Sequence, residues 1–149
     1  MKLKVKGITF LIDDEYEDFI KSHKWNISFY GYLINEVGLM FHRYVIGAQK
    51  GQIVDHKNLD ITDNRKQNLR ITDKSGNSMN RKKMNKKTSS KFKGVSWQLK
   101  RKKWRAYIVL NDIQYHLGEY TSEIDAARAY NDGAIKYFGE FAYLNKVDE

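Results

Sequence analysis

Four polar side chains in the centre of the chain combine residue types that could do hydrolytic chemistry. Asp55 and His56 are adjacent, Asn68 follows His56 by twelve positions, and Asn77 follows Asn68 by nine. A carboxylate and an amide oxygen are hard ligands that suit Mg²⁺ or Mn²⁺. A neutral histidine beside them can take a proton from water near pH 7. A metal, a base and an amide that orients the base are together the parts needed to hydrolyse a phosphodiester.

A short β-loop-β-α segment is expected to bring these four residues together. Residues 52–55 and 69–72 have strand composition, a polar loop joins them, and Thr72 can cap a helix that starts at about Ser75. Two of the four residues then end the first strand, one starts the second strand, and one lies on the first turn of the helix. The segment has too few large apolar residues for a core, so we expect it to pack on residues 1–48.

Residues 1–48 read as a small α+β unit that could supply this support. Residues 8–12 have strand character, and Asp13 and Asp14 can cap a helix that ends near Lys21. Residues 25–34 are rich in β-branched and aromatic side chains, and residues 39–46 are apolar around His42 and Arg43. The first half of the chain is therefore expected to mix short strands and helices.

The C-terminal half predicts a three-stranded antiparallel sheet with one helix on its back. Residues 94–99, 104–110 and 113–120 have strand patterns, and Asn111-Asp112 suits a two-residue hairpin turn. Ser122 can cap a helix with apolar residues at helical spacing, which Gly139 ends. The predicted fold class of the whole chain is α+β.

The charge of the chain is concentrated in one block. The 149 residues carry 27 Lys and Arg against 18 Asp and Glu, a formal net charge of +9, and residues 81–105 hold twelve basic side chains and no acidic one. Such a block is typical of a surface that follows the phosphates of nucleic acid. Cysteine is absent, which excludes disulfides, thiol catalysis and cysteine-based zinc sites. No apolar run of about 18 residues predicts a membrane span, and no signal peptide is apparent, so we expect a cytoplasmic protein.

The polar centre resembles the HNH endonuclease motif, in the form found in phage and intron homing endonucleases. The resemblance implies that Asp55 and Asn77 hold one divalent metal, that His56 is the general base, and that Asn68 holds His56. The third motif position is often histidine and here is Asn77, as in single-metal members that often nick one strand. The residues that carry the resemblance are Asp55-His56, Asp63-Asn64-Arg65-Lys66-Gln67-Asn68-Leu69-Arg70, Asn77 and Asn80-Arg81, preceded by His42-Arg43.

A second resemblance covers residues 92–145, which are similar to the AP2/ERF DNA-binding domain. That family reads the major groove of DNA with its three-stranded sheet. Several Arg and Trp residues that read the DNA in the plant proteins correspond here to Ser96, Gln98, Gln114 and His116. This difference implies a different DNA target. The residues that carry the resemblance are Phe92-Lys93-Gly94-Val95, Trp104-Arg105-Ala106-Tyr107-Ile108, Leu117-Gly118-Glu119-Tyr120, Ala126-Ala127-Arg128-Ala129-Tyr130-Asn131 and Phe141-Ala142-Tyr143-Leu144-Asn145.

The two resemblances together imply a metal-dependent DNA endonuclease of the homing type, compatible with a phage-encoded protein in a bacterial host. Residues 1–83 form the nuclease unit with its motif at 51–83, residues 84–91 a basic linker, and residues 92–145 the DNA-binding domain. The expected cofactor is Mg²⁺ or Mn²⁺ without zinc, and the partner is double-stranded DNA, bound by a monomer or homodimer. The candidate DNA-binding residues are Arg81, Lys82, Lys83, Lys86, Lys87, Lys93, Ser96, Gln98, Lys100, Lys103, Arg105, Tyr107, Gln114 and His116.

Some alternatives stay open from the sequence. The chain could be a DNA-binding regulator with a decayed nuclease unit, or it could bind RNA through exposed aromatic side chains. His42 is expected to have a structural or phosphate-positioning role rather than a catalytic one. Asp60 and Asp63 are expected to cap the polar loop rather than to bind a second metal.

Overall fold

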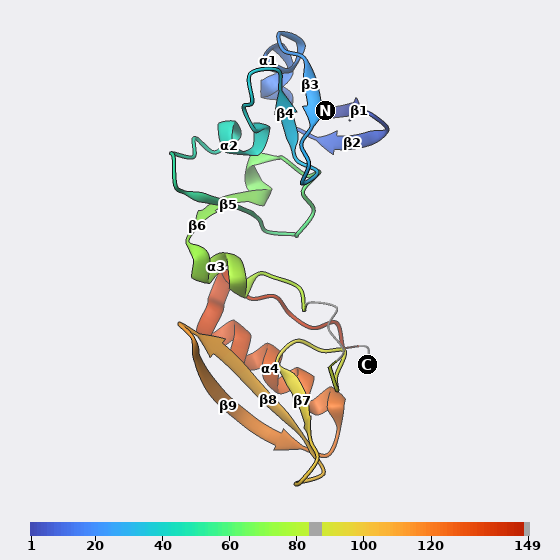
Figure 1. Cartoon of the computed structure of the whole chain (residues 1–149), viewed down its shortest axis with the longest axis vertical. Coiled ribbons are helices and arrows are strands. Elements are labelled where there is room, and N and C mark those ends of the chain that lie inside the picture. The colour runs from blue at the N-terminus through green and yellow to red at the C-terminus, as the bar shows by residue number, and fades with distance from the viewer. Residues whose placement is uncertain (84–87, 148–149) are drawn as a thin grey trace. The chain divides into compact units, whose positions relative to one another are not determined.

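The computed structural model describes residues 1–83 and 88–147, which form helices and four small antiparallel sheets (Figure 1). The predicted α+β class is confirmed. The chain divides into two units, Met1–Lys74 and Ser75–Glu149. In the part of the chain that is described, no helix is long and apolar enough to cross a membrane.

The N-terminal unit is built from three strand pairs and two short helices. Its first hairpin turns at Lys6 and Gly7, whose φ angles of 46° and 86° suit the tight two-residue turn that matches the twist of the strands. The elements, in chain order, are β1 (Lys2–Val5), β2 (Ile8–Leu11), a 3-10 helix (Asp14–Tyr16), α1 (Glu17–Lys21), β3 (Trp25–Ile27), β4 (Leu33–Asn35), α2 (Phe41–Val45), β5 (Ile53–His56), a 3-10 helix (Lys66–Asn68) and β6 (Leu69–Thr72).

The β5–β6 pair depends on the rest of this unit for its position. Leu69 of β6 is buried in the one apolar cluster that also contains residues of β1, β2, α1, β4 and α2. The loop between β5 and β6 is held by β2, because the Leu11 N–H donates to Thr62 O at 2.9 Å and the Asn64 N–H donates to Leu11 O at 2.9 Å. The expectation that this segment packs on residues 1–48 is confirmed for its two strands and the loop between them, but not for its helix.

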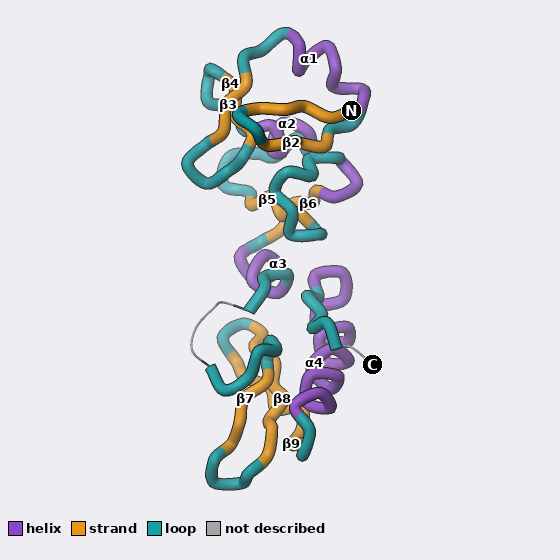
Figure 2. The backbone as a smooth tube through the Cα atoms, turned by 90° about the vertical axis from the view of Figure 1, so that its right-hand side faces the viewer, coloured by secondary structure: helices purple, strands orange, loops and turns teal. Residues whose placement is uncertain are grey.

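The C-terminal unit places one long helix along one face of a three-stranded antiparallel sheet (Figure 2). Small side chains such as Ala126, Ala127 and Ala134 face the sheet and are fully buried, which lets the helix lie close to it. Gly133 continues this surface, since a Cβ there would lie 2.6 Å from the side chain of Leu117. The elements are α3 (Lys74–Met79), β7 (Val95–Gln98), β8 (Lys103–Leu110), β9 (Ile113–Tyr120), α4 (Glu123–Phe138) and a 3-10 helix (Gly139–Phe141).

Local signals in the sequence explain the boundaries of this sheet and helix. Asn111 and Asp112 connect β8 and β9 with φ angles of 50° and 63°, as the hairpin turn requires. The Ser122 side chain accepts a hydrogen bond from the Asp125 N–H at 3.3 Å and caps α4, and Gly139 ends the helix with a φ of 52°. These three expectations from the sequence are confirmed.

The division between the two units differs from the expected boundary at residue 83. Almost all of α3 belongs to the C-terminal unit, because Met79 packs on the apolar cluster of Ile108 and Tyr130. The Lys93 ammonium group also donates to the carbonyl oxygens of Met79 at 2.6 Å and Arg81 at 2.8 Å, at the C-terminal end of α3. A cation at this end of a helix satisfies carbonyls that have no partner within the helix.

Of the expected linker at 84–91, the structure describes residues 88–91. Residues 84–87 lie outside the described residues. Ser90 is buried, its hydroxyl accepts from the Phe92 N–H at 3.0 Å, and the Ser89 hydroxyl accepts from the Trp97 N–H at 2.8 Å. Residues 88–91 are therefore part of the folded C-terminal unit, since their polar groups are used by its backbone.

Replacing Lys93 with Met tests its structural role at the end of α3. Burial lowers the pKa of Lys93 to about 8, yet the group remains a charged donor at neutral pH. Hydrogen bonds from charged groups contribute about 1.5–3 kcal/mol, so the free energy of unfolding should fall by about 2 kcal/mol. Hydrogen exchange at α3 should quicken, whereas Lys100→Met, at an exposed position, should change neither. Unchanged exchange at α3 in Lys93→Met would contradict the assignment.

Candidate functional site

His56 is buried at the end of β5 and is held by an amide that the sequence did not single out. Its Nε2 lies 3.1 Å from Oδ1 of Asn64, a residue that is only 1% exposed. Because an amide oxygen can only accept, this contact assigns the proton to Nε2 and the lone pair to Nδ1 in the neutral ring. Burial lowers the pKa of His56, with the Asn64 hydrogen bond acting in the opposite direction. His56 therefore stays neutral at pH 7 and has the tautomer of a base that works through Nδ1.

The prediction that Asn68 holds His56 is wrong in this structure. Asn68 instead closes the loop in which it lies, because its Nδ2 donates to Asp63 O at 2.8 Å and to Asn58 Oδ1 at 3.0 Å. Its Oδ1 accepts from the Asn58 N–H at 3.0 Å. The spacing from His56 pointed to an asparagine in this loop, but two asparagines four residues apart can exchange these roles. Only the path of the loop decides which amide reaches the histidine.

Asp55 forms a buried ion pair with Arg70, a residue that the sequence analysis did not assign to the site. Asp55 and Arg70 are directly opposite in the β5–β6 register, and the Arg70 Nε and Nη2 atoms lie 2.8 and 2.7 Å from Asp55 Oδ2. Both side chains are buried. A buried carboxylate needs such a partner because the loss of hydration costs several kcal/mol. The arginine in the Asn68-Leu69-Arg70 string was the available signal for this role.

The described part of the site offers few ligands to a divalent cation. Within the described residues, no group of three or more His, Cys, Asp or Glu side chains could hold a metal ion. Asp55 offers one carboxylate, whose Oδ2 already contacts Arg70. Mg²⁺ and Mn²⁺ accept such a site because they keep several waters and take substrate phosphate oxygens as ligands. Asn77 lies in α3, in the C-terminal unit, so its role as a second ligand stays a prediction.

Two rings pack around His56. The Tyr32 ring lies 6.2 Å from the His56 ring at an interplanar angle of 20°, and the His42 ring lies 4.7 Å from Tyr32 and 5.4 Å from His56. His42 is 5% exposed, and burial lowers its pKa to about 4, with the charge of His56 as a second cause. His42 therefore stays neutral and adds no positive charge beside His56. A position packed between rings agrees with the structural role that was expected for it.

Two aspartates of the loop between β5 and β6, Asp60 and Asp63, accept hydrogen bonds from other residues of that loop. Asp63 accepts two hydrogen bonds from Arg65, each at 2.8 Å, and one from Asn58, which together lower the pKa of Asp63. Asp60 Oδ1 accepts from the backbone and hydroxyl of Thr62. The expectation that Asp60 and Asp63 cap the loop is confirmed.

The basic block contains lysines with two different uses. Lys93 caps α3, and the Lys83 ammonium donates to the carbonyls of Ser90 and Phe92, so both have partners within their own unit, and their contact with phosphates stays a prediction. The side chains of these two lysines reach backbone oxygens of their own unit, and amino-acid composition alone does not predict such contacts. Lys86 and Lys87 lie outside the described residues. Of the basic Lys and Arg residues predicted to contact DNA, Arg81, Lys82, Lys100 and Lys103 are exposed.

One face of the C-terminal sheet carries most of the predicted reading residues. The register places Arg105 beside Ser96, Tyr107 beside His116, and Val109 beside Gln114, so these six share a face. Ser96 also accepts a hydrogen bond from Gln98 at 3.2 Å, and the Arg105 guanidinium lies 5.4 Å from the Tyr107 ring centre. Glu119 lies opposite Arg105 and pairs with Arg101 at 2.9 Å, an acid on this face that the sequence analysis did not weigh.

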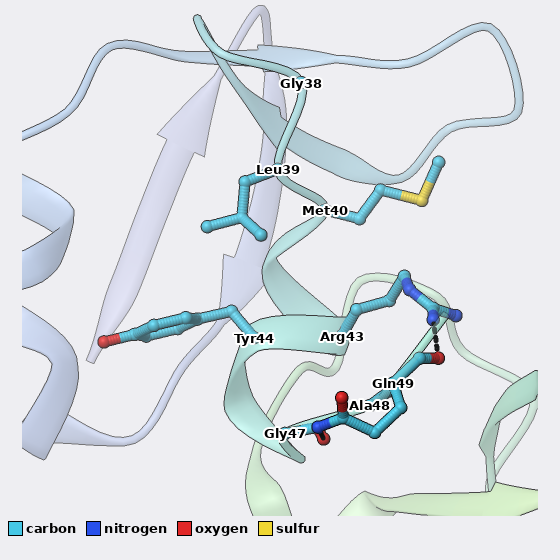
Figure 3. A pocket seen from close by; sticks show the side chains of 8 residues that line it. All are labelled: Gly38, Leu39, Met40, Arg43, Tyr44, Gly47, Ala48 and Gln49. Carbon is cyan, nitrogen blue, oxygen red and sulfur yellow. Dashed lines mark hydrogen bonds between the residues drawn. The ribbon is translucent and has the colours of Figure 1, made fainter. Parts of the chain in front are cut away.

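An open pocket lies beside α2, and its lining residues do not include His56. Figure 3 shows Arg43 pointing to the backbone of Gln49 across this pocket. The Arg43 guanidinium donates to Gln49 O at 2.7 Å and to Gln52 O at 2.8 Å, so it braces the segment that leads into β5. The lining residues are Gly38, Leu39, Met40, Arg43, Tyr44, Gly47, Ala48 and Gln49.

An aspartate in place of Asn64 tests which amide contacts His56. A carboxylate against Nε2 stabilises the imidazolium, so the pKa of His56 in Asn64→Asp should rise by about one unit or more. The measurement is an NMR titration of the His56 ring. Asn68→Asp is the matched control at the same loop and should move this pKa much less. The reverse order of the two shifts would show that Asn68 is the partner.

The buried His42 predicts a stability that depends on pH. The unfolded chain binds a proton on this residue below its ordinary pKa of 6.5, whereas the folded chain does so only near 4. Between these values the unfolded state binds more protons. The contribution of the neutral His42 to the free energy of unfolding is therefore complete above pH 6.5 and decreases as pH falls toward 4. The loss should reach up to about 3 kcal/mol in urea unfolding experiments, with His56 adding to it in the same direction. His42→Phe should flatten the slope, and an equal slope in that variant contradicts the prediction.

Comparison with known proteins identifies the family. No family model and no solved structure matches the chain. It is 31% identical over 151 residues to a protein of Acanthamoeba polyphaga mimivirus that is named an uncharacterized HNH endonuclease. The alignment covers 96% of this chain and 78% of the relative. Together with the order of Asp55, His56 and the asparagines after them, this similarity shows that the chain belongs to the HNH endonuclease family.

Proposed function

We propose that the chain is a metal-dependent DNA endonuclease in which His56 is the general base. The observation that carries the proposal is the buried His56–Asn64 pair at the end of β5, beside the Asp55–Arg70 ion pair. A lone histidine would leave its tautomer undefined, whereas this pair leaves Nδ1 as the basic atom. The similarity to a protein named as an HNH endonuclease supports the same chemistry.

Each residue of the candidate site has its own role in the proposed hydrolysis. His56 takes a proton from the attacking water through Nδ1, and Asn64 holds the ring and stabilises the N–H as the ring becomes charged. Arg70 pairs with the Asp55 carboxylate and fixes it in position. When bound, Mg²⁺ or Mn²⁺ supplies positive charge for the phosphate oxygens and the leaving oxygen. Asp55 and Asn77 are the ligands that the sequence motif suggests for this ion.

Double-stranded DNA is the proposed substrate, and the sheet β7–β8–β9 the proposed reading surface. The polar and aromatic face around Arg105 and Tyr107, with Ser96, Gln98, Gln114 and His116, supports an AP2-like mode of binding in the major groove. The exposed Arg81, Lys82, Lys100 and Lys103 contact phosphates. A nuclease that carries its own reading domain fits a site-directed enzyme of the homing type, acting as a monomer or homodimer.

Incubation of supercoiled plasmid with the protein and Mg²⁺ or Mn²⁺ tests the function directly. Wild type should convert the plasmid to nicked or linear forms, and EDTA should stop the reaction. His56→Ala should lower the rate by about 10²- to 10⁴-fold, because that is the contribution of a positioned general base. His23→Ala, in the same unit but at the end of α1, should keep near-normal activity.

The outcome separates the endonuclease from its alternative. Cleavage that survives in a correctly folded His56→Ala protein refutes the assignment of the base. If wild type binds duplex DNA tightly but cuts none with either metal, the chain is a DNA-binding regulator instead. Equal melting temperatures of the three proteins establish that a lost activity is not lost folding.

A further inference from the structure

The turn between β3 and β4 presents two aromatic side chains to solvent. Phe29 is 97% exposed and Tyr30 is 72% exposed, although both sit at the centre of a tight turn. Their rings contact each other edge to face, with centroids 5.2 Å apart. Aromatic side chains normally supply a core or an interface with their large apolar area, and neither ring does so within this unit. This pair therefore has no packing role that would explain its residue types.

The turn itself does not need aromatic residues. The Gly31 N–H donates to Ser28 O at 2.9 Å, the Ser28 N–H donates to Tyr32 O at 2.8 Å, and the Ser28 hydroxyl accepts from the Tyr32 N–H at 3.0 Å. Gly31 supplies the φ of +89° that closes the turn. All of these bonds come from the residues on either side of the pair. Polar residues would therefore serve the turn equally well, and the two rings are held on a rigid support.

The same turn lies against the candidate active site. Tyr32, two residues after Tyr30, packs on the rings of His42 and His56. Gly31 contacts the β5–β6 loop so closely that a Cβ there would lie 2.9 Å from Ile61 Cδ1. The turn that carries the two rings therefore contacts the elements that form the candidate site. The two rings and His56 belong to the same compact unit, Met1–Lys74.

The charge of this unit indicates how it would hold DNA. Residues 1–74 carry 12 Lys and Arg against 10 Asp and Glu, so phosphate contacts alone provide little affinity there. Apolar side chains inserted between base steps are a different means, which unstacks and bends the duplex. Aromatic rings also stack on bases of any sequence.

We propose that Phe29 inserts between neighbouring base pairs beside the phosphate at His56, and that Tyr30 stacks on a base or sugar at the opened step. This inference rests on the proposed endonuclease function, because it takes DNA as the occupant. Insertion would open the step next to the phosphate and present its backbone to His56. The pair would then determine where the strand is distorted, whereas the C-terminal sheet determines which sequence is bound.

A plasmid relaxation experiment tests the wedge without any need for cleavage or for a known target. Closed circular plasmid is relaxed by a topoisomerase in EDTA with wild-type protein, and in Mg²⁺ with His56→Ala. A wedge unwinds the duplex, so the purified plasmid should carry a linking-number change that rises with protein concentration. At equal occupancy in band-shift measurements, Phe29→Ala/Tyr30→Ala should reduce this change by about twofold or more. Phe29→Trp should retain it.

Val37→Ala is the matched control, because Val37 is 77% exposed at the other end of the same β3–β4 hairpin and should leave the linking number unchanged. An equal change in wild type and the double variant, or none in wild type, overturns the proposal. Self-association that the double variant abolishes, with unwinding unaffected, would show that the rings contact a second copy instead. Unwinding by a wild type that never cuts DNA would refute the nuclease and leave the wedge intact.

Discussion

The position of the candidate site depends on two backbone hydrogen bonds made by Leu11. Its N–H and C=O groups pair with Thr62 and Asn64, at the far end of the loop from His56. The loop has no apolar core, so these two bonds to β2, together with the polar contacts inside the loop, fix where Asn64 lies. The Asn64 side chain in turn contacts the His56 imidazole. The orientation of His56 therefore depends on β2, a strand more than forty residues earlier in the sequence.

Two buried polar pairs make this small unit sensitive to any change in its loop. Asp55–Arg70 and His56–Asn64 both lie where water is largely excluded, so each group relies on its partner for the interactions that water would otherwise supply. Such pairs add little net stability, but they disfavour every arrangement that leaves one member unpaired. The two pairs therefore define one geometry of the base and the carboxylate.

The C-terminal unit shows that positive charge in a sequence has more than one use. The block of basic residues at 81–105 indicated contact with nucleic acid, yet Lys83 and Lys93 direct their ammonium groups to backbone carbonyls. A lysine chain is long and flexible, so it can reach a helix end as readily as a phosphate. Lys93 also attaches α3 to the sheet unit, which moves the helix of the nuclease motif into the neighbouring unit.

Much of the local structure followed from the sequence, because its causes are local. The turn at Asn111-Asp112, the Ser122 cap, the strands around residues 54 and 70, and the identities of Asp55 and His56 depend on neighbouring residues and on spacing. The choice of Asn64 over Asn68, the pairing of Asp55 with Arg70, and the attachment of α3 were decided only by the tertiary structure. These three features depend on which polar atoms the folded chain brings within hydrogen-bonding distance, and residues of the same type at similar spacing do not distinguish the alternatives.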